Sequence, residues 1–195
     1  MPRANNREVI IAAALRCFAR QGYDGTRIAD IAAESGLSVA ALYVHFPSVK
    51  ALAQELYLRH LPPYARALQA TCEDAKLSVP DRAEALVHLT LATYRDNPDA
   101  FRFVLNQLPR FLRETDPDAP LPLDTITGLI GAGQQIGVFR DGDPRVLAAM
   151  FLGAILRVIT LDEFGSMHGF RLEPAHESTI IAAATRLLGV DQDAG

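Results

Sequence analysis

Two ring side chains, Tyr43 and His45, flank a run of small residues within the segment 26–46, TRIADIAAESGLSVAALYVHF. On a helix that turns by about 100° per residue and buries Leu42, the small residues fall between about 160° and 260° from Leu42. These small residues are Ala40, Ala41 and Val44. A face with little bulk and two hydrogen-bonding rings at its rim suits close approach to the base edges of a nucleic acid. The chemistry indicated is noncovalent recognition.

Two short helices joined by a tight turn would position this face. Ile31 points inward from the first helix, and residues 35–37, Ser-Gly-Leu, form the turn. Ser38 is a suitable N-cap for the second helix, whose Leu42 and Phe46 face the core. This order is the pattern of a helix-turn-helix, in which the second helix enters the DNA major groove.

The whole chain is predicted to be all-α, with about nine helices, because apolar residues recur at spacings of three and four. We expect a three-helix head over residues 1–47 and a helical body over 48–195. The expected landmarks are a first helix over 6–21, Thr26 as the N-cap of the second, a kink or split at Pro62-Pro63, Pro80 before the fifth helix, Asn97-Pro98 before the sixth, a loop over 115–123, and helices over about 123–136, 143–164 and 174–189.

Composition excludes several classes of protein. Of 195 residues, 49% are hydrophobic and 22% are charged, which is typical of a chain that buries a core. The longest apolar run, residues 146–156, is well short of the roughly 20 residues that a membrane span needs. No secretory signal is recognised, so we expect a cytoplasmic protein without membrane contact. Cys17 and Cys72 fit packed thiols better than a disulfide.

Motifs for catalysis or metal binding are missing from the sequence. The five histidines form no His-Glu-x-x-His pair, and no Cys-x-x-Cys occurs, so we expect no metal site. Gly131, Gly133 and Gly137 lie in or at the end of a predicted helix rather than after a strand, which argues against a phosphate-binding loop. We therefore expect no enzyme, no catalytic residue and no cofactor.

Residues 7–52 resemble the N-terminal domain of TetR-family transcriptional regulators. The shared signals are Phe18, Gly22-Tyr23, Thr26, Ile31-Ala32, Gly36-Leu37-Ser38 and Leu42-Tyr43-x-His45-Phe46. The body resembles the ligand-binding and dimerisation domain of that family in layout only. Two positions depart from the family pattern, because Ala40 replaces a usual glycine and Val49 stands where a lysine is common.

The resemblance implies a set of DNA contacts. Phosphate contacts are implied for Thr26, Tyr43, His45 and Lys50, base contacts for Arg27, Val39, Ala40, Ala41 and Val44, and Ser38 belongs to the same surface. The four apolar residues in this set offer no hydrogen bonds and can only touch thymine methyl groups or exclude bulk. Polar base readout is therefore expected to depend on Arg27, Tyr43 or His45.

The distribution of charge predicts a homodimer. Residues 1–60 carry seven basic and five acidic side chains, whereas the rest of the chain is acidic, for a net charge of -4. One head with so few cations should bind DNA weakly, so two heads must act together on half-sites about 34 to 36 Å apart. The helices over 143–164 and 174–189 are apolar on more than one face, and the resemblance implies that they form the dimer interface. Internal burial is the alternative for both.

The body is also expected to bind a small-molecule effector, because its helices carry aromatic and polar groups that could line a cavity. The candidates are His88, Tyr94, Phe101, Phe103, Gln107, Phe111 and Arg157. Ordinary packing is the alternative for each of these residues. For Arg157, an ion pair across a dimer, an acidic ligand and solvent all stay open.

These features together predict a transcriptional regulator that binds double-stranded operator DNA and is released by its effector. Repression rather than activation is implied by the resemblance alone. The alternative is a helical ligand-binding protein whose head contacts another protein.

Overall fold

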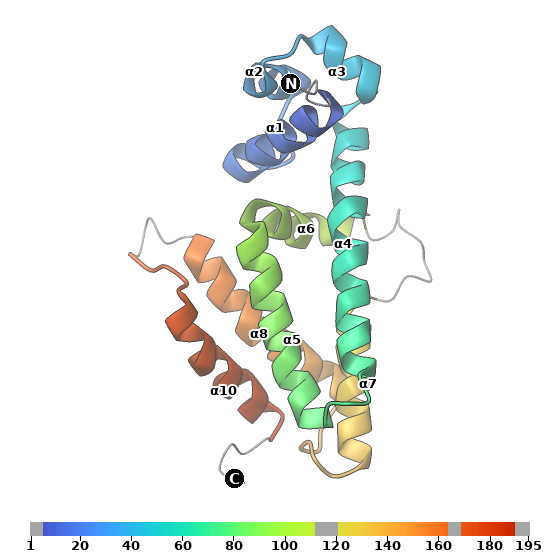
Figure 1. Cartoon of the computed structure of the whole chain (residues 1–195), viewed down its shortest axis with the longest axis vertical. Coiled ribbons are helices and arrows are strands. Elements are labelled where there is room, and N and C mark those ends of the chain that lie inside the picture. The colour runs from blue at the N-terminus through green and yellow to red at the C-terminus, as the bar shows by residue number, and fades with distance from the viewer. Residues whose placement is uncertain (1–5, 112–120, 164–168, 190–195) are drawn as a thin grey trace. The chain divides into compact units, whose positions relative to one another are not determined.

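The computed structural model describes residues 6–111, 121–163 and 169–189 (Figure 1). These residues form nine α-helices and a short 3₁₀ helix, with no strand among them, which confirms the all-α prediction. The α-helices are α1 (Asn6–Gln21), α2 (Ile28–Ser35), α3 (Val39–His45), α4 (Val49–Glu73), α5 (Val79–Asp96), α6 (Pro98–Phe111), α7 (Pro122–Gln135), α8 (Pro144–Glu163) and α10 (Glu177–Leu187). The 3₁₀ helix η1 (Pro174–His176) precedes α10.

The chain divides into two compact units. Unit 1 comprises Met1–Pro63 and Asn97–Ala119, and unit 2 comprises Tyr64–Asp96 and Pro120–Gly195. We expected the head to end at residue 47, but unit 1 also includes the first part of α4 and all of α6. The apolar residues of these two helices complete the core around α1, which explains the difference.

The core of unit 1 is built on α1, which contacts both α2 and α6. Its largest members include Ile10, Phe18, Ile31, Leu42, Phe46, Leu52, Leu56, Tyr57, Phe103 and Phe111. The rings of Phe18 and Phe103 stack with their centroids 5.0 Å apart. This packing fixes α2 and α3 on the rest of the unit.

The turn between α2 and α3 follows the sequence-based prediction. Gly36 adopts a φ of 70°, in the left-handed region that favours glycine, and it ends α2. Ser38 caps α3 through its Oγ, which accepts a hydrogen bond from the Ala41 N–H at 3.2 Å. The start of α2 differs, because Arg27 and not Thr26 is the N-cap residue. Its N–H donates to the Asp30 carboxylate at 2.8 Å.

Prolines delimit the longer helices less sharply than the sequence suggests. α4 runs through Pro62 and Pro63 without being split, although unit 1 ends at Pro63. Pro80 lies in the first turn of α5, where its missing N–H costs no helical hydrogen bond. The predicted loop over 115–123 lies mostly outside the described residues, and its last two residues already belong to α7.

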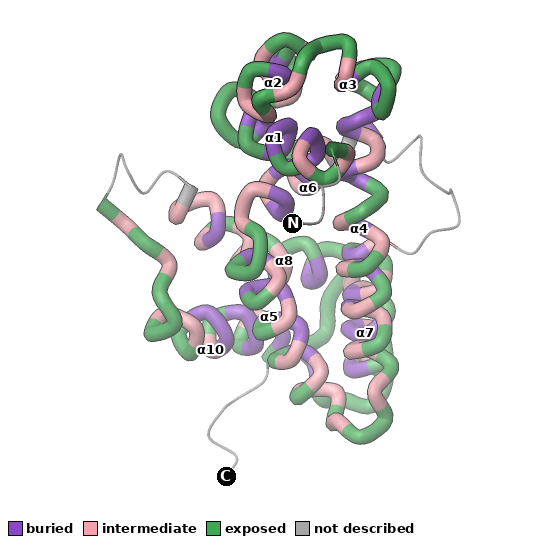
Figure 2. The backbone as a smooth tube through the Cα atoms, turned by 45° about the horizontal axis from the view of Figure 1, so that its top comes forward, coloured by how far each residue is buried: buried purple, intermediate pink, exposed green. Residues whose placement is uncertain are grey.

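Unit 2 is a bundle of α5, α7, α8 and α10. α8 contacts α5, α7 and α10, and α5 also contacts α7 and α10. Figure 2 shows buried and exposed stretches alternating along α7, as expected for amphipathic helices around a core. The Tyr94 hydroxyl donates to Asp162 Oδ2 at 2.5 Å, and the Leu172 N–H donates to Asp162 Oδ1 at 2.8 Å. Asp162 therefore joins α5 and α8 to the segment before α10.

The apolar helix α8 is buried on one side only. Its stretch Pro144–Asp162 has a mean hydropathy of 1.7 and by length and composition could cross a membrane, yet it packs on three helices of unit 2. Only 28% of this stretch is buried within the chain. The buried side is formed by Leu147, Ala148, Phe151, Ile155 and Ile159. The expected end of this helix near Phe164 lies outside the described residues.

Candidate nucleic-acid interface

One side of α3 is anchored in the core of unit 1. Leu42 is fully buried and Phe46 is 4% exposed, and both belong to the apolar cluster around α1. The Phe46 N–H donates to the Leu42 carbonyl at 2.9 Å, which closes the last turn of the helix. The orientation of α3 about its own axis is therefore fixed by two inward side chains.

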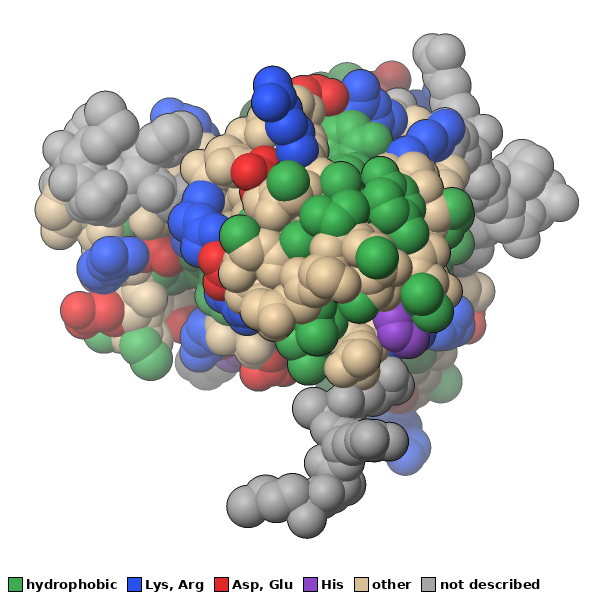
Figure 3. Space-filling model, turned by 90° about the horizontal axis from the view of Figure 1, so that it is seen from above, with side chains coloured by type: hydrophobic (Ala, Val, Ile, Leu, Met, Phe, Trp, Pro, Cys, Tyr) green, Lys and Arg blue, Asp and Glu red, His purple; other side chains and the backbone are tan. Residues whose placement is uncertain are grey.

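The opposite side of α3 is open to solvent. Val44 is 81% exposed, Tyr43 is 53% exposed and Val39 is 38% exposed, whereas Ala41 is half-buried. Ala40 and His45 are exposed as well. Figure 3 looks onto the end of the molecule that carries α2 and α3, and hydrophobic side chains gather there between lysine and arginine side chains. The structure thus brings the predicted small face to the surface.

The two rings at the rim of this face have free polar groups. Within the described part of the chain, neither Tyr43 nor His45 forms a hydrogen bond or ion pair through its side chain. Ser38, also exposed, uses its Oγ as the cap of α3. Tyr43 and His45 are therefore available to an external partner.

Most cations of unit 1 are already paired with carboxylates. Arg16 and Arg20 both bind Glu34 at 2.6 Å. The hydrogen bond from Arg20, and after it the one from Arg16, holds the pKa of Glu34 below its usual value. Arg59 binds Glu8 at 2.7 Å and likewise lowers the pKa of that carboxyl. Further pairs join Arg7 to Glu55 and Arg110 to Asp24, each at 2.8 Å. The positive charge that unit 1 can offer a polyanion is therefore limited.

Arg27 and Lys50 are the two cations predicted to contact DNA. Arg27 is exposed at the start of α2 and forms no ion pair with any described residue. Lys50 is exposed in the first turn of α4. Thr26 differs from both, because it is 7% exposed and its hydroxyl donates to the Gly22 carbonyl at 2.7 Å. That hydroxyl therefore stabilises the turn before α2 and is not part of the outer surface.

Comparison with known proteins agrees with this geometry. Residues 10–56, from α1 into α4, match the family described as bacterial regulatory proteins of the tetR family. Residues 10–56 therefore form the N-terminal domain found in TetR-family transcriptional regulators. It is 33% identical over 123 residues to the HTH-type transcriptional regulator RutR of Escherichia coli K12, which covers 63% of this chain and 53% of RutR. The chain thus spans about half the length of this curated relative.

Solved structures share the TetR-family fold. A Clostridium perfringens protein assigned as a fatty acid metabolism regulator matches with a TM-score of 0.74 and 18% identity, over 93% of this chain and 97% of that one. The TetR-family regulator PfmR from Thermus thermophilus matches with a TM-score of 0.70 and 22% identity, over the same shares of the two chains. At these identities the likeness establishes the fold.

The candidate effector residues are divided between the two units. Phe103 and Phe111 are buried in unit 1, where Phe103 stacks on Phe18 and Phe111 lies 5.4 Å from the Tyr57 ring. Phe101 is 7% exposed and Gln107 is half-buried on the same helix, α6. The rings of Phe103 and Phe111 therefore serve packing, which sequence reasoning kept as the alternative.

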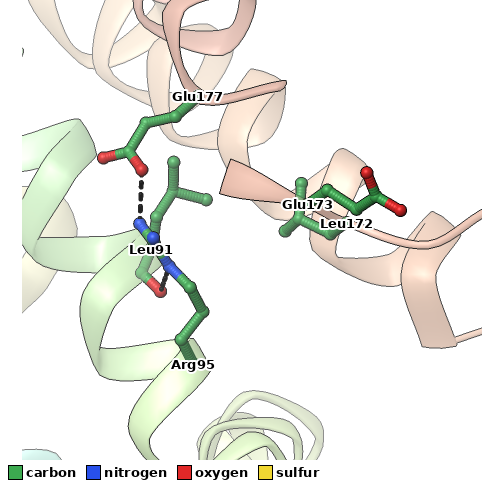
Figure 4. Close-up of a pocket in the computed structure, with 5 residues that line it drawn as sticks. All are labelled: Leu91, Arg95, Leu172, Glu173 and Glu177. Atoms are coloured by element: carbon green, nitrogen blue, oxygen red, sulfur yellow. Dashed lines mark hydrogen bonds and ion pairs between the residues drawn. The ribbon is translucent and has the colours of Figure 1, made fainter. Parts of the chain in front are cut away.

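The remaining candidates lie in unit 2, where Arg157 is exposed on α8. Tyr94 is 3% exposed and is bonded to Asp162, as described above. His88 is exposed and hydrogen-bonded to Glu177, which Arg95 also binds at 2.6 Å (Figure 4). Partial burial acts to raise the pKa of Glu177, but the hydrogen bonds from His88 and Arg95 outweigh it and lower the pKa. This cluster fastens the start of α10 to α5.

The pocket beside this cluster is too small for an effector. It is lined by Leu91, Arg95, Leu172, Glu173 and Glu177 and has a volume of about 10 Å³ (Figure 4). A volume of that size holds about one water molecule.

A larger hollow of about 410 Å³ lies elsewhere in unit 2. Gln69, Cys72 and Glu73 from the end of α4, Arg82 from α5, and Asp124, Thr125, Gly128, Leu129 and Ala132 from α7 line it. The Arg82 guanidinium donates to the carbonyls of Cys72, Asp74 and Leu77, so it caps the end of α4. Burial raises the pKa of the Cys72 thiol to about 11.

Sequence reasoning missed this hollow. Its polar residues stand at the end of one helix and the start of another, where such residues are common for reasons of capping, so no motif marks them. Among the described residues, no cluster of three His, Cys, Asp or Glu side chains could hold a metal ion.

Proposed function

We propose that this chain is a repressor that binds double-stranded operator DNA as a homodimer in the cytoplasm and leaves it when a small molecule binds unit 2. The observation that carries the proposal is the outer face of α3, which is exposed, small in bulk and bordered by Tyr43 and His45. The match of residues 10–56 to the TetR family supports DNA binding by that face, because the second helix of a helix-turn-helix enters the major groove.

The shortage of unpaired cations supports cooperation between two heads. DNA affinity depends strongly on the number of phosphates that Lys and Arg neutralise. With Arg16, Arg20 and Arg59 held by carboxylates, one head neutralises few phosphates. Two heads on one duplex double that number and add a fixed spacing between half-sites.

The exposed side of α8 supports a dimer interface. Val146 and Met150 are 54% and 50% exposed, and Ala149, Gly153 and Arg157 lie on the same side of the helix. We call these five residues the α8 stripe. A second copy of the stripe would cover its apolar part around a twofold axis, with Gly153 permitting close approach of the two helices.

α10 contributes less to this interface than its sequence suggests. Ile180, Ile181, Ala184 and Leu188 are all buried within unit 2. The apolar residues of this helix that are not buried are exposed Ala183 and half-buried Ala182 and Leu187. We therefore place most of the apolar contact between protomers on α8.

The 410 Å³ hollow is our candidate effector site. Ligand pockets commonly have volumes of roughly 300 to 1,000 Å³, and Leu129, Gly128 and Ala132 give this one an apolar floor. Residues 69–73 at its wall end the helix α4 that begins four residues after α3 ends. An effector that favours one arrangement of α4 therefore favours or opposes operator binding, and the coupling must be reciprocal.

A DNA-binding titration tests the first part of the proposal. Duplexes are selected from a random library with the full chain, and their affinity is measured by fluorescence anisotropy at several salt concentrations. The double variant Arg27→Ala, Tyr43→Ala should bind more weakly and show a shallower salt dependence. A wild-type chain that selects no DNA would instead favour a head that contacts another protein.

Sedimentation analysis tests the dimer. Met150→Arg places a charge in the middle of the α8 stripe and should convert the dimer to monomers. Leu58→Arg, at a residue of α4 that is 52% exposed, is the matched control and should remain dimeric. A dimer that survives Met150→Arg would contradict the assignment of α8.

A thermal-shift screen tests the effector site. A panel of small amphipathic molecules is screened against the wild type and against Gly128→Trp, whose ring would occupy the hollow. Nothing lies within 4 Å of a Cβ built at Gly128, so the backbone there leaves room for a side chain to begin. Circular dichroism verifies that the variant folds. Compounds that stabilise only the wild type are then titrated with and without selected DNA. Equal affinities in the two titrations would contradict the coupling.

A further inference from the structure

We propose that α3 selects its DNA sequence mainly through the 5-methyl groups of thymines, with Val44 as the principal reader and Ala40 beside it. This inference rests on the proposed function, since it names what the same surface recognises in the major groove. It assigns sequence discrimination to apolar contact, and assigns the polar groups of the head to positioning.

The centre of the outer face of α3 consists of carbon atoms. Val44 projects furthest, with 81% of it exposed, and Ala40 lies four residues earlier on the same side of the helix. Neither side chain can donate or accept a hydrogen bond. The Ser38 hydroxyl, just before the helix, accepts from the Ala41 N–H and belongs to the cap. Whatever lies directly against this face meets methyl groups.

An apolar face discriminates among bases because of what each base presents in the major groove. Thymine presents a methyl group, whereas cytosine, adenine and guanine present amino groups or ring acceptors. Covering a polar edge with Val44 removes water from it and supplies no replacement hydrogen bond, which is unfavourable. Covering a thymine methyl removes apolar area from water, which is favourable. Thymine is thus preferred opposite Val44 and Ala40.

The polar groups stand where they can hold the helix in place. Tyr43 and His45 flank the apolar centre on opposite sides, and their side chains have no hydrogen-bond partner within the described residues. From the rim of the face they reach phosphates or sugars more readily than the bases beneath its centre. Contacts to the phosphates and sugars of DNA fix the position of the protein along the duplex, but they carry no sequence information.

The spacing of the two readers suits neighbouring bases. Ala40 and Val44 are separated by four residues, or about 6 Å along the helix axis. Successive bases of one strand are about 3.4 Å apart. The two side chains therefore reach thymines one or two base pairs apart in each half-site.

Replacing thymine by uracil tests the inference directly, because uracil lacks only the methyl group. Duplexes selected by the full chain from a random library are amplified once with dTTP and once with dUTP, which yields two pools of identical sequence. We expect the uracil pool to bind at least tenfold more weakly than the thymine pool. On the unselected library, the two forms should bind equally.

A substitution assigns the effect to its residue. Val44→Ala should reduce the thymine-to-uracil ratio of affinities at least threefold and leave binding to the unselected library unchanged. Val138→Ala, the same change at an exposed valine of unit 2, is the control and should keep the full ratio. Circular dichroism of both variants verifies that they fold.

The outcomes separate this inference from the proposed function. Selection of DNA followed by equal affinity for the thymine and uracil pools would overturn thymine-methyl recognition and leave operator binding intact. A full thymine-to-uracil ratio in Val44→Ala would also overturn it, because another residue would then read the methyl groups. A chain that selects no DNA at all would overturn both.

Discussion

Leu42 and Val44, two residues apart on α3, occupy opposite environments: Leu42 is fully buried and Val44 is 81% exposed. A separation of two residues is about 200° of helical rotation, so one side chain holds the helix and the other is presented by it. Within this seven-residue helix, Leu42 therefore contributes to the stability of the fold, whereas Val44 is available for contact with a partner.

Truncation of the two side chains should therefore have different effects on the free energy of unfolding. Leu42→Ala removes buried carbon atoms from the core of unit 1 and should cost about 2 to 5 kcal/mol. Val44→Ala should change the free energy of unfolding by less than about 0.5 kcal/mol. Urea titrations followed by circular dichroism measure both values. A large loss in Val44→Ala would mean that this side chain is packed in solution.

A close approach in unit 2 gives a second prediction. A Cβ added to Gly133 would lie 2.1 Å from the Phe139 ring, whereas one added to Gly131 would meet nothing within 4 Å. Gly133→Ala should therefore cost about 1 to 3 kcal/mol through overpacking. Gly131→Ala, two residues away on α7, should stabilise the chain by up to about 1 kcal/mol, since alanine favours the helix. Equal melting temperatures for the two variants would contradict the packing around Phe139.

The pair of arginines on Glu34 predicts a specific dependence on pH. Hydrogen bonds from Arg20 and Arg16 lower the pKa of this carboxyl below its ordinary value of 4.5. Because the folded pKa is the lower one, the stabilisation is fully present above about pH 4.5 and disappears as the pH falls through the folded pKa. Glu34→Gln should be less stable than the wild type at pH 7, and the difference should shrink below pH 4.5. A difference that stays constant throughout an acid titration would contradict this assignment.

The cysteines should react slowly in the folded protein. Burial raises the pKa of the Cys72 thiol to about 11 and also raises the pKa of Cys17. At pH 8 only about one Cys72 thiol in a thousand is then ionised, and the thiolate is the reactive form. In a Cys17→Ser variant, labelling of Cys72 with a thiol reagent should be at least tenfold slower in buffer than in denaturant. Equal rates would show that the thiol is not shielded.

The sequence predicted the head in detail because its signals are local. Gly36 ends α2 by its positive φ, Ser38 caps α3, and the spacing of Leu42 and Phe46 sets which side of α3 is buried. The N-cap of α2 was assigned one residue too early, because a threonine is a better cap than an arginine by type. Thr26 uses its hydroxyl on Gly22 instead, and Asp30 supplies the capping carboxylate.

The sequence could not predict the body to the same depth because its contacts are long-range. Phe103 and Phe111 carry the composition expected of a pocket, yet they pack against α1 and α4 residues that are distant in the chain. The hollow in unit 2 is formed by the ends of helices whose partners no local pattern specifies. The sequence did predict that α8 is apolar on more than one face, and the exposed side chains of Val146 and Met150 agree with that prediction.

We propose that the exposed face of α3 lies against DNA, and a charge introduced at the centre of this face tests the proposal most directly. Val44→Glu places a carboxylate where phosphates and base edges would approach, while Leu123→Glu adds the same charge at an exposed residue of unit 2. Anisotropy titrations with selected duplexes should show at least a hundredfold loss of affinity for Val44→Glu and wild-type affinity for Leu123→Glu. Wild-type affinity in a folded Val44→Glu variant would contradict the account.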